Sequence, residues 1–358
     1  MFELVHKSPN VAHIVLCLSI CFTTFGCHPV DGYVHLSGAT MGTHYAVTAK
    51  CELPAQAVEK ELATVNGEMS TYDSESMLSR FNRANVGEWW EISIDLAEVI
   101  EAAQSLSERS NGAFDVTVGP LVNLWGFGPE ARTNVPEART KVPEVPDSQA
   151  IAAAHARVGF RHLSVRRVGP GQSRAELRKD IALSVDLSAI AKGHGVDRLA
   201  LRLETLGCFD YLVDIGGEVR VAGVNPQGDA WRVGVEVPNA GEFGGVQRIL
   251  QMSEGAIATS GDYRNFFEVD GTRYSHTIDP RSGMPVTHAL ASVSVVHESA
   301  MWADGFATTI AVLGPEAGFA FAEKTNLSAL FIIRTASGFE ERYTGAMTHY
   351  VHNLEGPN

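Results

Sequence analysis

Hydrophobic and polar positions follow two different periods along this chain. Residues 33–50 (YVHLSGATMGTHYAVTAK) alternate in steps of two around a Gly-Ala-Thr-Met-Gly turn, which predicts a β-hairpin. Residues 54–70 and 94–110 instead repeat apolar side chains three and four positions apart, which predicts two amphipathic helices. Asn111 and Gly112 close the second of these helices. The chain therefore mixes strands and helices from its start.

The same reading extends towards the C-terminus. Asp147 can cap a helix that reaches Arg157, and Gly159 ends it. Strand patterns recur around Leu163, Ile181 and residues 211–215, 231–237 and 293–296. Residues 129–146 are rich in Pro and Glu and repeat the sequence PEART, which predicts an exposed loop. The pattern predicts an α+β protein with one domain over residues 33–350.

The N-terminal residues look like a targeting segment. A basic start is followed by the apolar residues 11–25 and by a break at Gly26-Cys27-His28-Pro29, which predicts a secretory signal over residues 1–27. The run is shorter than the ~20 residues that span a bilayer, which disfavours a permanent transmembrane helix. Cys27 resembles the processing site of a bacterial lipoprotein, so lipidation and simple cleavage both stay open. We expect an exported, periplasmic protein, anchored to the inner membrane if Cys27 is lipidated.

The composition limits which kinds of ligand and partner this protein can bind. Lys and Arg number 28 against 42 Asp and Glu, a net charge of −14, which disfavours nucleic acid. Outside the leader, Cys27, Cys51 and Cys208 are too few and too scattered for a disulfide scaffold or a zinc site. The sequence has neither a glycine-rich dinucleotide fingerprint after a strand nor a P-loop. Any phosphate-binding chemistry must use other segments.

Five segments are polar, punctuated by glycine and poorly explained as core or as solvated surface. They are residues 41–43, 69–72 with 79–82, 112–120, 186–193, and 274–280 with 303–308. Asp304 and Thr308 are four positions apart in a helical pattern, so their oxygens lie one turn apart on one face, which suits a hard cation such as Mg²⁺. The alternative is structural: Asp304 forms a cap or a salt bridge, and Thr308 bonds back to its helix.

Three further residues are candidates for chemistry. Lys192 lies where a loop enters a helix, so its cation and free backbone N–H groups can meet a phosphate. Asp186 opens the same segment, where it is either a ligand contact or a turn former. His276, in a polar Ser-His-Thr-Ile-Asp-Pro context, is the best candidate for a general base because imidazole titrates near neutral pH.

In this order and spacing, the five segments resemble the ApbE-type FAD:protein FMN transferase family, from about residue 37 to residue 309. The resemblance implies an α+β fold with T-fold-like halves around a central flavin-binding cleft. It also implies Mg²⁺ held by Asp304, Thr308 and the carbonyl of Ala189. The FAD contacts that it implies are Met41, Tyr72, Ala113, Phe114, Asp115, Asp186, Lys192, Ile278 and Ala307. Tyr72 and Phe114 could instead be ordinary core aromatics.

The activity implied by the resemblance is Mg²⁺-dependent transfer of the FMN moiety of FAD to a Thr or Ser hydroxyl of a target protein, with release of AMP. Exported flavoproteins of electron-transport complexes would be the acceptors. Two alternatives stay open: an FAD pyrophosphatase that releases free FMN and AMP, and a non-enzymatic FAD-binding lipoprotein. Ser37-Gly38-Ala39-Thr40 also resembles the family's acceptor sequence, although Val34 stands where the acceptor has Asp, so self-modification at Thr40 is a further hypothesis.

Overall fold

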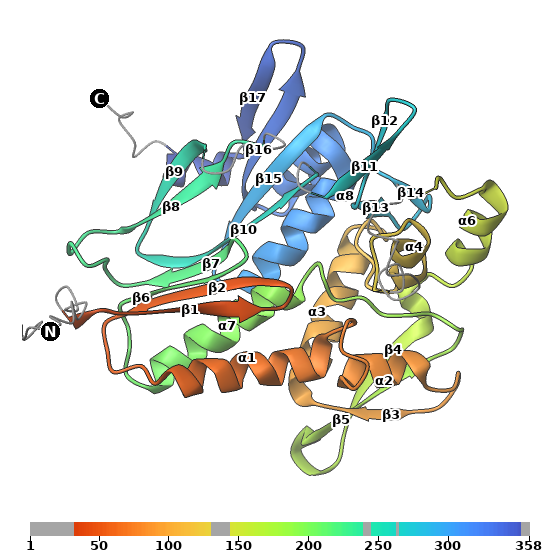
Figure 1. Ribbon diagram of the computed structural model, residues 1–358, viewed down its shortest axis with the longest axis horizontal. Helices are drawn as coiled ribbons and strands as arrows, with labels where there is room; N and C mark the ends of the chain where they lie inside the picture. The colour runs from red at the N-terminus through yellow and green to blue at the C-terminus, as the bar shows by residue number, and fades with distance from the viewer. Residues whose placement is uncertain (1–31, 130–143, 239–244, 263–264, 352–358) are drawn as a thin grey trace, which may run out of the picture.

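A computed structural model describes residues 32–129, 144–238, 245–262 and 265–351. The predicted leader and residues 130–143 of the Pro- and Glu-rich loop lie outside the described residues. The described chain mixes helix and sheet, as its periodicity predicts (Figure 1).

One large antiparallel sheet organises the molecule. Its order is β1-β2-β6-β7-β10-β15-β16-β17, and every neighbouring pair is antiparallel. Its strands are β1 (Val34–Thr40), β2 (Thr43–Ala49), β6 (Tyr211–Ile215), β7 (Glu218–Ala222), β10 (Glu254–Gly261), β15 (Leu290–His297), β16 (Ser328–Thr335) and β17 (Gly338–Tyr343).

Smaller sheets surround the large one. The order β3-β5-β4 joins β3 (Trp90–Ile92), β5 (Arg174–Lys179) and β4 (Leu163–Val168), and three two-stranded ribbons pair β8 (Trp231–Glu236) with β9 (Val246–Met252), β11 (Phe266–Val269) with β12 (Thr272–Ser275), and β13 (Ile278–Asp279) with β14 (Met284–Pro285).

The helices are α1 (Ala55–Met69), α2 (Met77–Arg83), α3 (Ile94–Arg109), α4 (Gly119–Leu124), α6 (Ser148–His155), α7 (Ala191–Thr205), α8 (Ala300–Lys324) and α9 (Thr348–Val351). Short 3-10 turns lie at Phe160–His162, Pro170–Gln172 and Gly345–Met347. Helix α7 packs between α1 and α8, and α8 lies against β10 and β15 (Figure 1).

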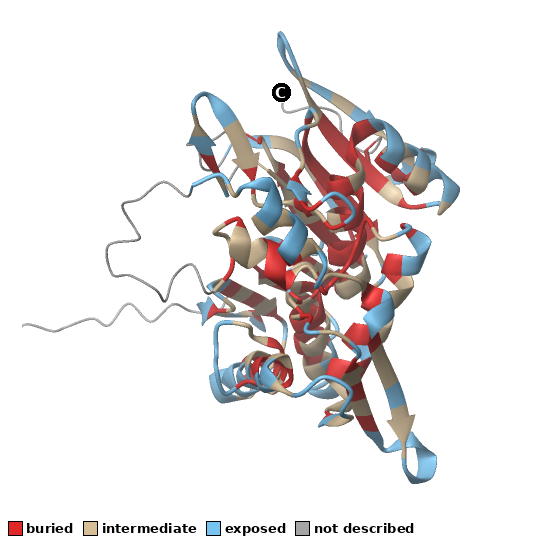
Figure 2. Cartoon of the chain, turned by 90° about the vertical axis from the view of Figure 1, so that its right-hand side faces the viewer, coloured by how far each residue is buried: buried red, intermediate tan, exposed pale blue. Residues whose placement is uncertain are grey.

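The large sheet is buried on both faces. Alternate residues of its strands, such as Val213 and Ile215, pack towards α1 and α7. Residues such as Val219 and Leu330 face the other way and pack with Trp231 of the β8-β9 ribbon. Successive side chains of a strand point to opposite faces, so the same strands contribute to two cores, and buried residues accordingly gather in the interior (Figure 2).

Local sequence explains the element boundaries. Met41 and Gly42, with φ of 47° and 72°, form the turn between β1 and β2. Both adopt the left-handed conformation that a two-residue hairpin turn requires. Ser93 caps α3 by accepting the amide of Leu96, and Asp147 caps α6 through Gln149 and Ala150. The predicted hairpin, the helices over residues 54–70 and 94–110, and the helix after Asp147 are confirmed.

One expectation differs from the structure, and one cross-link was not predicted. The strand expected around Ile181 ends at Lys179, and Ile181 lies in a bend. Lys179 takes the last inward position of β5, because its ammonium donates to the carbonyls of Phe81 and Asn82. Cys51 and Cys208 form a disulfide with a Cα–Cα distance of 5.5 Å, although they are 157 residues apart in sequence. The cysteines make no scaffold, but they do make this one cross-link in the described part of the chain.

By length and composition alone, α8 could cross a membrane, but 67% of its most apolar stretch is buried. It is the central core helix, and its backbone departs from helical geometry at Gly314, just before Pro315.

Candidate active site

The site begins where α7 meets the start of α8. Asp197 of α7 accepts the amides of Ala300 and Met301 at 3.0 Å and so caps α8. The Gly193 amide donates to Asp304 at 3.1 Å. A Cβ on Gly193 would lie 2.2 Å from the carbonyl oxygen of Ala300, so only glycine permits this approach. The two helices are therefore locked together beside Asp304.

Lys192 lies between two buried carboxylates. Its Nζ is 2.5 Å from Glu218 Oε1, and the side chain of Glu218 is only 4% exposed. Asp304 is also buried and interacts electrostatically with Lys192. Glu218 Oε2 has no hydrogen-bond partner. Two buried carboxylates thus share the ammonium of one partly exposed lysine, and the group carries an excess of negative charge when all three are ionised.

The pKa values reflect this imbalance. Burial raises the pKa of Glu218 to about 7. The charge of Lys192 lowers this pKa, but repulsion from Asp304 partly offsets that effect. Burial also raises the pKa of Asp304, against the opposing effect of Lys192. Burial alone would lower the pKa of Lys192, but Glu218 and Asp304 outweigh it and raise the pKa. An additional cation would relieve the repulsion between the two carboxylates.

Two of the three predicted oxygen donors for a hard cation lie one turn apart on α8. Thr308 follows Asp304 by one helical turn, and its hydroxyl lies 3.0 Å from that of Ser260. Ala189 stands in the turn just before α7. Among the described residues, no three His, Cys, Asp or Glu side chains gather into a metal site. The donors fit an ion such as Mg²⁺, which needs few protein oxygens when phosphates and water complete its shell.

His276 is half-buried and held by backbone contacts. Its Nδ1 lies 3.0 Å from the carbonyl oxygen of Asn265, so Nδ1 carries the proton and Nε2 is left as the acceptor. Burial lowers the pKa of His276, and the charge of Lys192 acts in the same direction, against the bond to Asn265 and the charge of Asp262. The imidazole is neutral at pH 7, as a general base must be.

Segments far apart in sequence meet around this cluster. The side chain of Asn82 bonds both the amide and the carbonyl of Val185, each at 2.8 Å. The Asp186 amide donates to Val116 at 2.7 Å, and the Asp186 carboxylate accepts the amide and hydroxyl of Ser188. Four of the five predicted segments, those that hold Asn82, Val116, Asp186 and Asp304, are thereby linked, directly or through α7.

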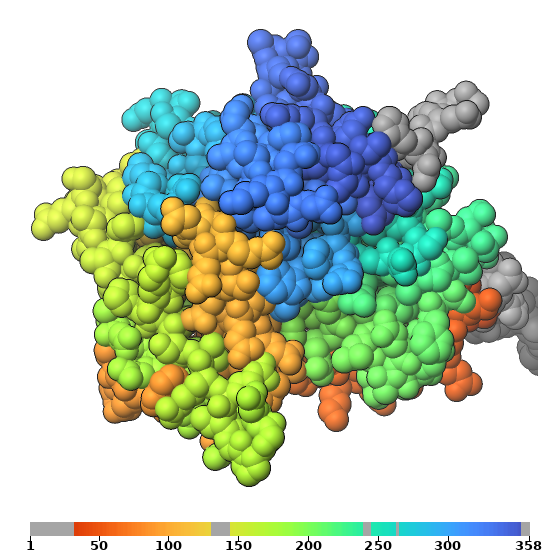
Figure 3. Space-filling view, turned by 180° about the vertical axis from the view of Figure 1, so that it is seen from behind, coloured from red at the N-terminus to blue at the C-terminus, as the bar shows by residue number. Residues whose placement is uncertain are grey.

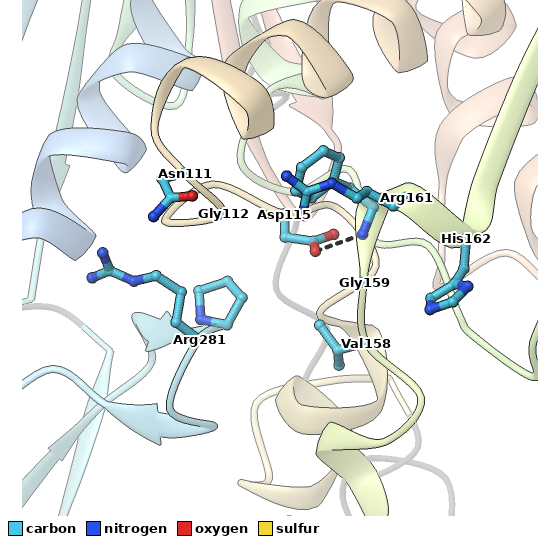
Figure 4. A pocket seen from close by; sticks show the side chains of 10 residues that line it. Asn111, Gly112, Asp115, Val158, Gly159, Arg161, His162 and Arg281 are labelled. Carbon is cyan, nitrogen blue, oxygen red and sulfur yellow. Dashed lines mark hydrogen bonds between the residues drawn. The ribbon is translucent and has the colours of Figure 1, made fainter.

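A cavity of about 270 Å³ opens beside the third segment (Figure 4). Asp115 lies in its wall and accepts the amide of Phe160 at 2.8 Å, drawn as a dashed line, besides two bonds from Thr117. Burial raises the pKa of Asp115, against these hydrogen bonds. Its carboxylate thus mainly holds the loop together, and Arg161 and Arg281 supply positive charge to the cavity wall.

Tyr72 and Met41 lie near the cluster. Tyr72 is 54% exposed, and its hydroxyl donates to Phe127 O at 3.5 Å. The Phe127 ring in turn lies 6.3 Å from the ring of His276. Met41 lies close enough to α7 that a Cβ on Gly195 would be 2.7 Å from its methyl group. Tyr72 is therefore not a core aromatic and can offer its face to a flat ring.

Other predicted contacts have buried side chains. Ala113, Phe114 and Ala307 are at most 2% exposed, and Ile278 is 5% exposed within a small core. Phe114 packs as a core aromatic. Because the side chains of Phe114 and Ala307 are buried in the core, direct contact with a ligand at these positions would use the backbone.

The sequence reading missed Glu218. The only local signal is the Gly216-Gly217-Glu218 turn. A charged residue there begins a strand whose other buried side chains, Val219 and Val221, are apolar. Thr40, proposed as a self-modification site, is 8% exposed, and its hydroxyl accepts from Asn66 at 3.0 Å. An incoming phosphorus atom would have to displace this contact.

Comparison with known proteins connects the geometry to a family. The model of the ApbE family matches residues 41–331. The chain is 44% identical over 324 residues to a protein of Vibrio cholerae named FAD:protein FMN transferase, covering 88% of this chain and 92% of that protein. It is 36% identical over 313 residues to the Escherichia coli protein of that name, covering 85% of each.

Solved structures agree. The flavin transferase ApbE from Vibrio cholerae superposes with a TM-score of 0.77 at 41% identity, covering 89% of this chain and 99% of that one. The apo flavinyl transferase ApbE of Pseudomonas stutzeri gives a TM-score of 0.78 at 39% identity, covering 89% and 97%. The α+β fold expected from the resemblance is confirmed, and the chain belongs to the ApbE family.

Proposed function

We propose that this protein transfers the FMN moiety of FAD to a Thr or Ser hydroxyl of an acceptor protein and releases AMP. Its curated relatives carry the name of that activity. The observation that carries the proposal is the grouping of Lys192, Glu218 and Asp304 within electrostatic range of one another, with His276 in range of Lys192. A cation, buried carboxylates and a neutral base are what pyrophosphate chemistry needs.

FAD binding uses several segments of this site. The ammonium of Lys192 attracts the pyrophosphate, and Glu218 keeps that ammonium in place. Tyr72 offers an exposed aromatic face to the flavin ring, and Met41 borders α7 beside it. Backbone groups of residues 113–115 and the carboxylate of Asp186 complete the pocket.

The metal is the second part of the proposal. Asp304, Thr308 and the carbonyl of Ala189 would hold Mg²⁺. When bound, that ion neutralises charge on the two phosphates and on the leaving group. The excess negative charge of the buried Glu218–Asp304 pair and the unpartnered Oε2 of Glu218 support a cation here.

The transfer step needs a base. His276 Nε2 accepts the proton of the acceptor hydroxyl as its oxygen attacks the phosphorus of the FMN half. The bond from that phosphorus to the bridging oxygen breaks, and AMP leaves with the bridging oxygen. The Nδ1 contact with Asn265 orients the ring for this role.

The proposed compartment is the periplasm, with exported flavoproteins of electron-transport complexes as acceptors and Cys27 as the lipid anchor. The Cys51–Cys208 disulfide supports export, because disulfides persist in oxidising compartments. The acidic net charge fits a protein partner better than a nucleic acid.

The test is to incubate the leaderless protein with FAD, Mg²⁺ and a small acceptor domain that carries an Asp-x-x-Ser-Gly-Ala-Thr segment. The expected result is an acceptor that gains the mass of one FMN phosphoester, with an equal amount of AMP, and no gain after EDTA treatment. Matched reactions use an acceptor whose Thr is replaced by Val.

Other results would replace the proposal. Free FMN and AMP with an unmodified acceptor would identify a pyrophosphatase. FAD that is bound but left intact, even with Mg²⁺, would identify a binding protein. Flavin mass on this chain itself would instead point to Thr40.

A further inference from the structure

The end of α7 and the loop that follows it expose an unusual amount of apolar surface. Leu201, Leu206 and Phe209 are 54%, 37% and 66% exposed. They account for three of the eight large hydrophobic side chains that are exposed in the described part of the chain, within nine consecutive positions. We call these three residues the α7-end surface. Exposed apolar side chains that gather in one region of a surface often mark a site of interaction.

This surface is rigid. Gly207, with φ of 82°, ends α7, and the next residue, Cys208, is cross-linked to Cys51. The amide of Lys50 donates to the carbonyl of Asp210 at 2.9 Å. Phe209 is therefore held out into solvent by a disulfide on one side and a strand on the other, so its exposure is not the result of a loose loop.

Strand register places this surface beside the point where the chain enters the fold. Val34 of β1 pairs with Ala49 of β2, and Ala49 pairs with Tyr211 of β6. Two strand spacings of ~4.8 Å therefore separate the start of β1 from the residue after the loop, about 10 Å in all. The Lys50 ammonium lies 5.8 Å from the centroid of the Tyr33 ring, which connects the same two places.

The views agree with this arrangement. The C-terminal end of α7 and the start of β1 lie on the same side of the molecule (Figure 1). The green surface that includes α7 meets the red-orange surface of the first elements along one edge (Figure 3).

The length of chain before β1 limits where a lipid anchor could stand. Val34 is seven positions after Cys27, a span of at most ~25 Å when the chain is fully extended. A lipid chain on Cys27 would thus keep the start of β1, and with it the α7-end surface, within ~25–35 Å of the bilayer. We propose that Leu201, Leu206 and Phe209 dock on the bilayer that holds the anchor. The proposal rests on the anchor at Cys27 that we proposed above.

Local charge indicates which force would hold this contact. Arg202 lies next to Leu201 and Lys50 lies beside the loop, but Glu204, Glu52 and Asp210 lie among them. The surface therefore has no excess of positive charge to attract anionic lipids. Burial of the Phe209 ring and the two leucines in the headgroup region would supply the affinity, as for other interfacial apolar anchors.

The experiment separates this surface from both the anchor and the catalytic site. The leaderless protein carries an N-terminal hexahistidine tag and is held on phosphatidylcholine vesicles by a small fraction of nickel-chelating lipid, which replaces the acyl chain. Vesicle flotation then gives the bound fraction for wild type, Phe209→Asp and the matched control Val246→Asp. Val246 is 54% exposed and lies at the end of the β8-β9 ribbon opposite to Trp231, the residue of that ribbon whose ring contacts Tyr33.

The expected result is a partition coefficient about tenfold lower for Phe209→Asp than for wild type, and no change for Val246→Asp. Replacing half of the phosphatidylcholine with phosphatidylglycerol should change wild-type binding by less than about twofold. AMP formation from FAD in solution should be equal for all three proteins, so a failed transferase assay and a failed flotation assay remain distinct.

Three results would overturn the proposal. Equal flotation of wild type and Phe209→Asp would show that the α7-end surface does not bind the bilayer. An unmodified Cys27 in protein isolated from cells, seen by mass spectrometry, would remove the anchor that brings the surface to the bilayer. A concentration-dependent dimer that Phe209→Asp abolishes would make a second copy of the chain the occupant of the surface.

Discussion

The two faces of the eight-stranded sheet hold different kinds of interaction, and β7 contributes to both. On the helix side, Glu218 meets Lys192 in a buried charged group. One residue later, Val219 faces the opposite side and packs with Trp231 and other apolar side chains. The comparison suggests a division of roles: the apolar face supplies stability alone, whereas the charged face sets its charged group beside a second apolar core and gives up some stability to gain chemistry.

Asp304→Asn tests the charged face most severely. The substitution keeps an oxygen for the Gly193 amide but removes the charge that pairs with Lys192 and would hold Mg²⁺. We expect AMP formation to fall at least about 10³-fold while the circular dichroism spectrum stays the same. Thr308→Val should also lower activity. Thr309→Val is the matched control, because the Thr309 hydroxyl bonds only the helix carbonyl of Gly305; equal losses in both threonine variants would contradict the assignment.

Trp231→Ala tests the apolar face. Trp231 is 5% exposed, and its indole donates to the carbonyl of Ala222 at 2.9 Å. Its removal should lower the free energy of unfolding by about 3–5 kcal/mol, measured by urea titration. The activity per folded molecule should stay within about twofold at low temperature. A large drop in that activity would show that the two faces are not separate.

His276→Gln removes the proposed base. We expect transfer to fall about 100-fold with little change in the affinity for FAD. Because the pKa of His276 is lowered, the wild-type rate should decline only as pH falls below the ordinary histidine range, when the imidazole gains a proton. That acidic limb should vanish in the variant. His35→Gln, at an exposed residue of β1, should behave like wild type.

Glu218→Gln should have the smallest effect on stability and an effect that depends on pH. A carboxyl group whose pKa is raised by folding stabilises the fold below its unfolded value, and this stability is lost as pH rises towards about 7. Metal-free wild type should therefore melt lower at pH 8 than at pH 5. The variant should recover roughly 2–4 °C at pH 8, read by differential scanning calorimetry. A pH-independent difference would argue against a buried, strained carboxylate.

Local sequence predicted the elements whose patterns are repeated over several turns or pairs. The hairpin over residues 33–50 and the helix over residues 94–110 have strong periodicity and turn residues at their ends. The strand predicted around Ile181 ends earlier, at Lys179. Lys179 fills the last inward position of β5, and its ammonium is hydrogen-bonded by carbonyls that are distant in sequence, which no local pattern shows.

The candidate site was less accessible from local patterns. The resemblance picked out Lys192 and Asp304, and the helical spacing placed Asp304 and Thr308 on one face. Glu218 was missed because its role depends on β7 lying beside α7, which no local pattern encodes. The same holds for Cys51 and Cys208, which the register of β2 and β6 brings together.

The contact at Gly193 has a consequence for how this site could vary. A single methyl group at Gly193 would collide with the Ala300 carbonyl. Atomic radii at this contact therefore set the distance between Lys192, the proposed phosphate ligand, and Asp304, the proposed metal ligand. Mutational libraries that fix Gly193 could explore the flavin pocket widely at constant charge spacing. Libraries that vary Gly193 should yield folded, inactive proteins in which the helices have moved apart.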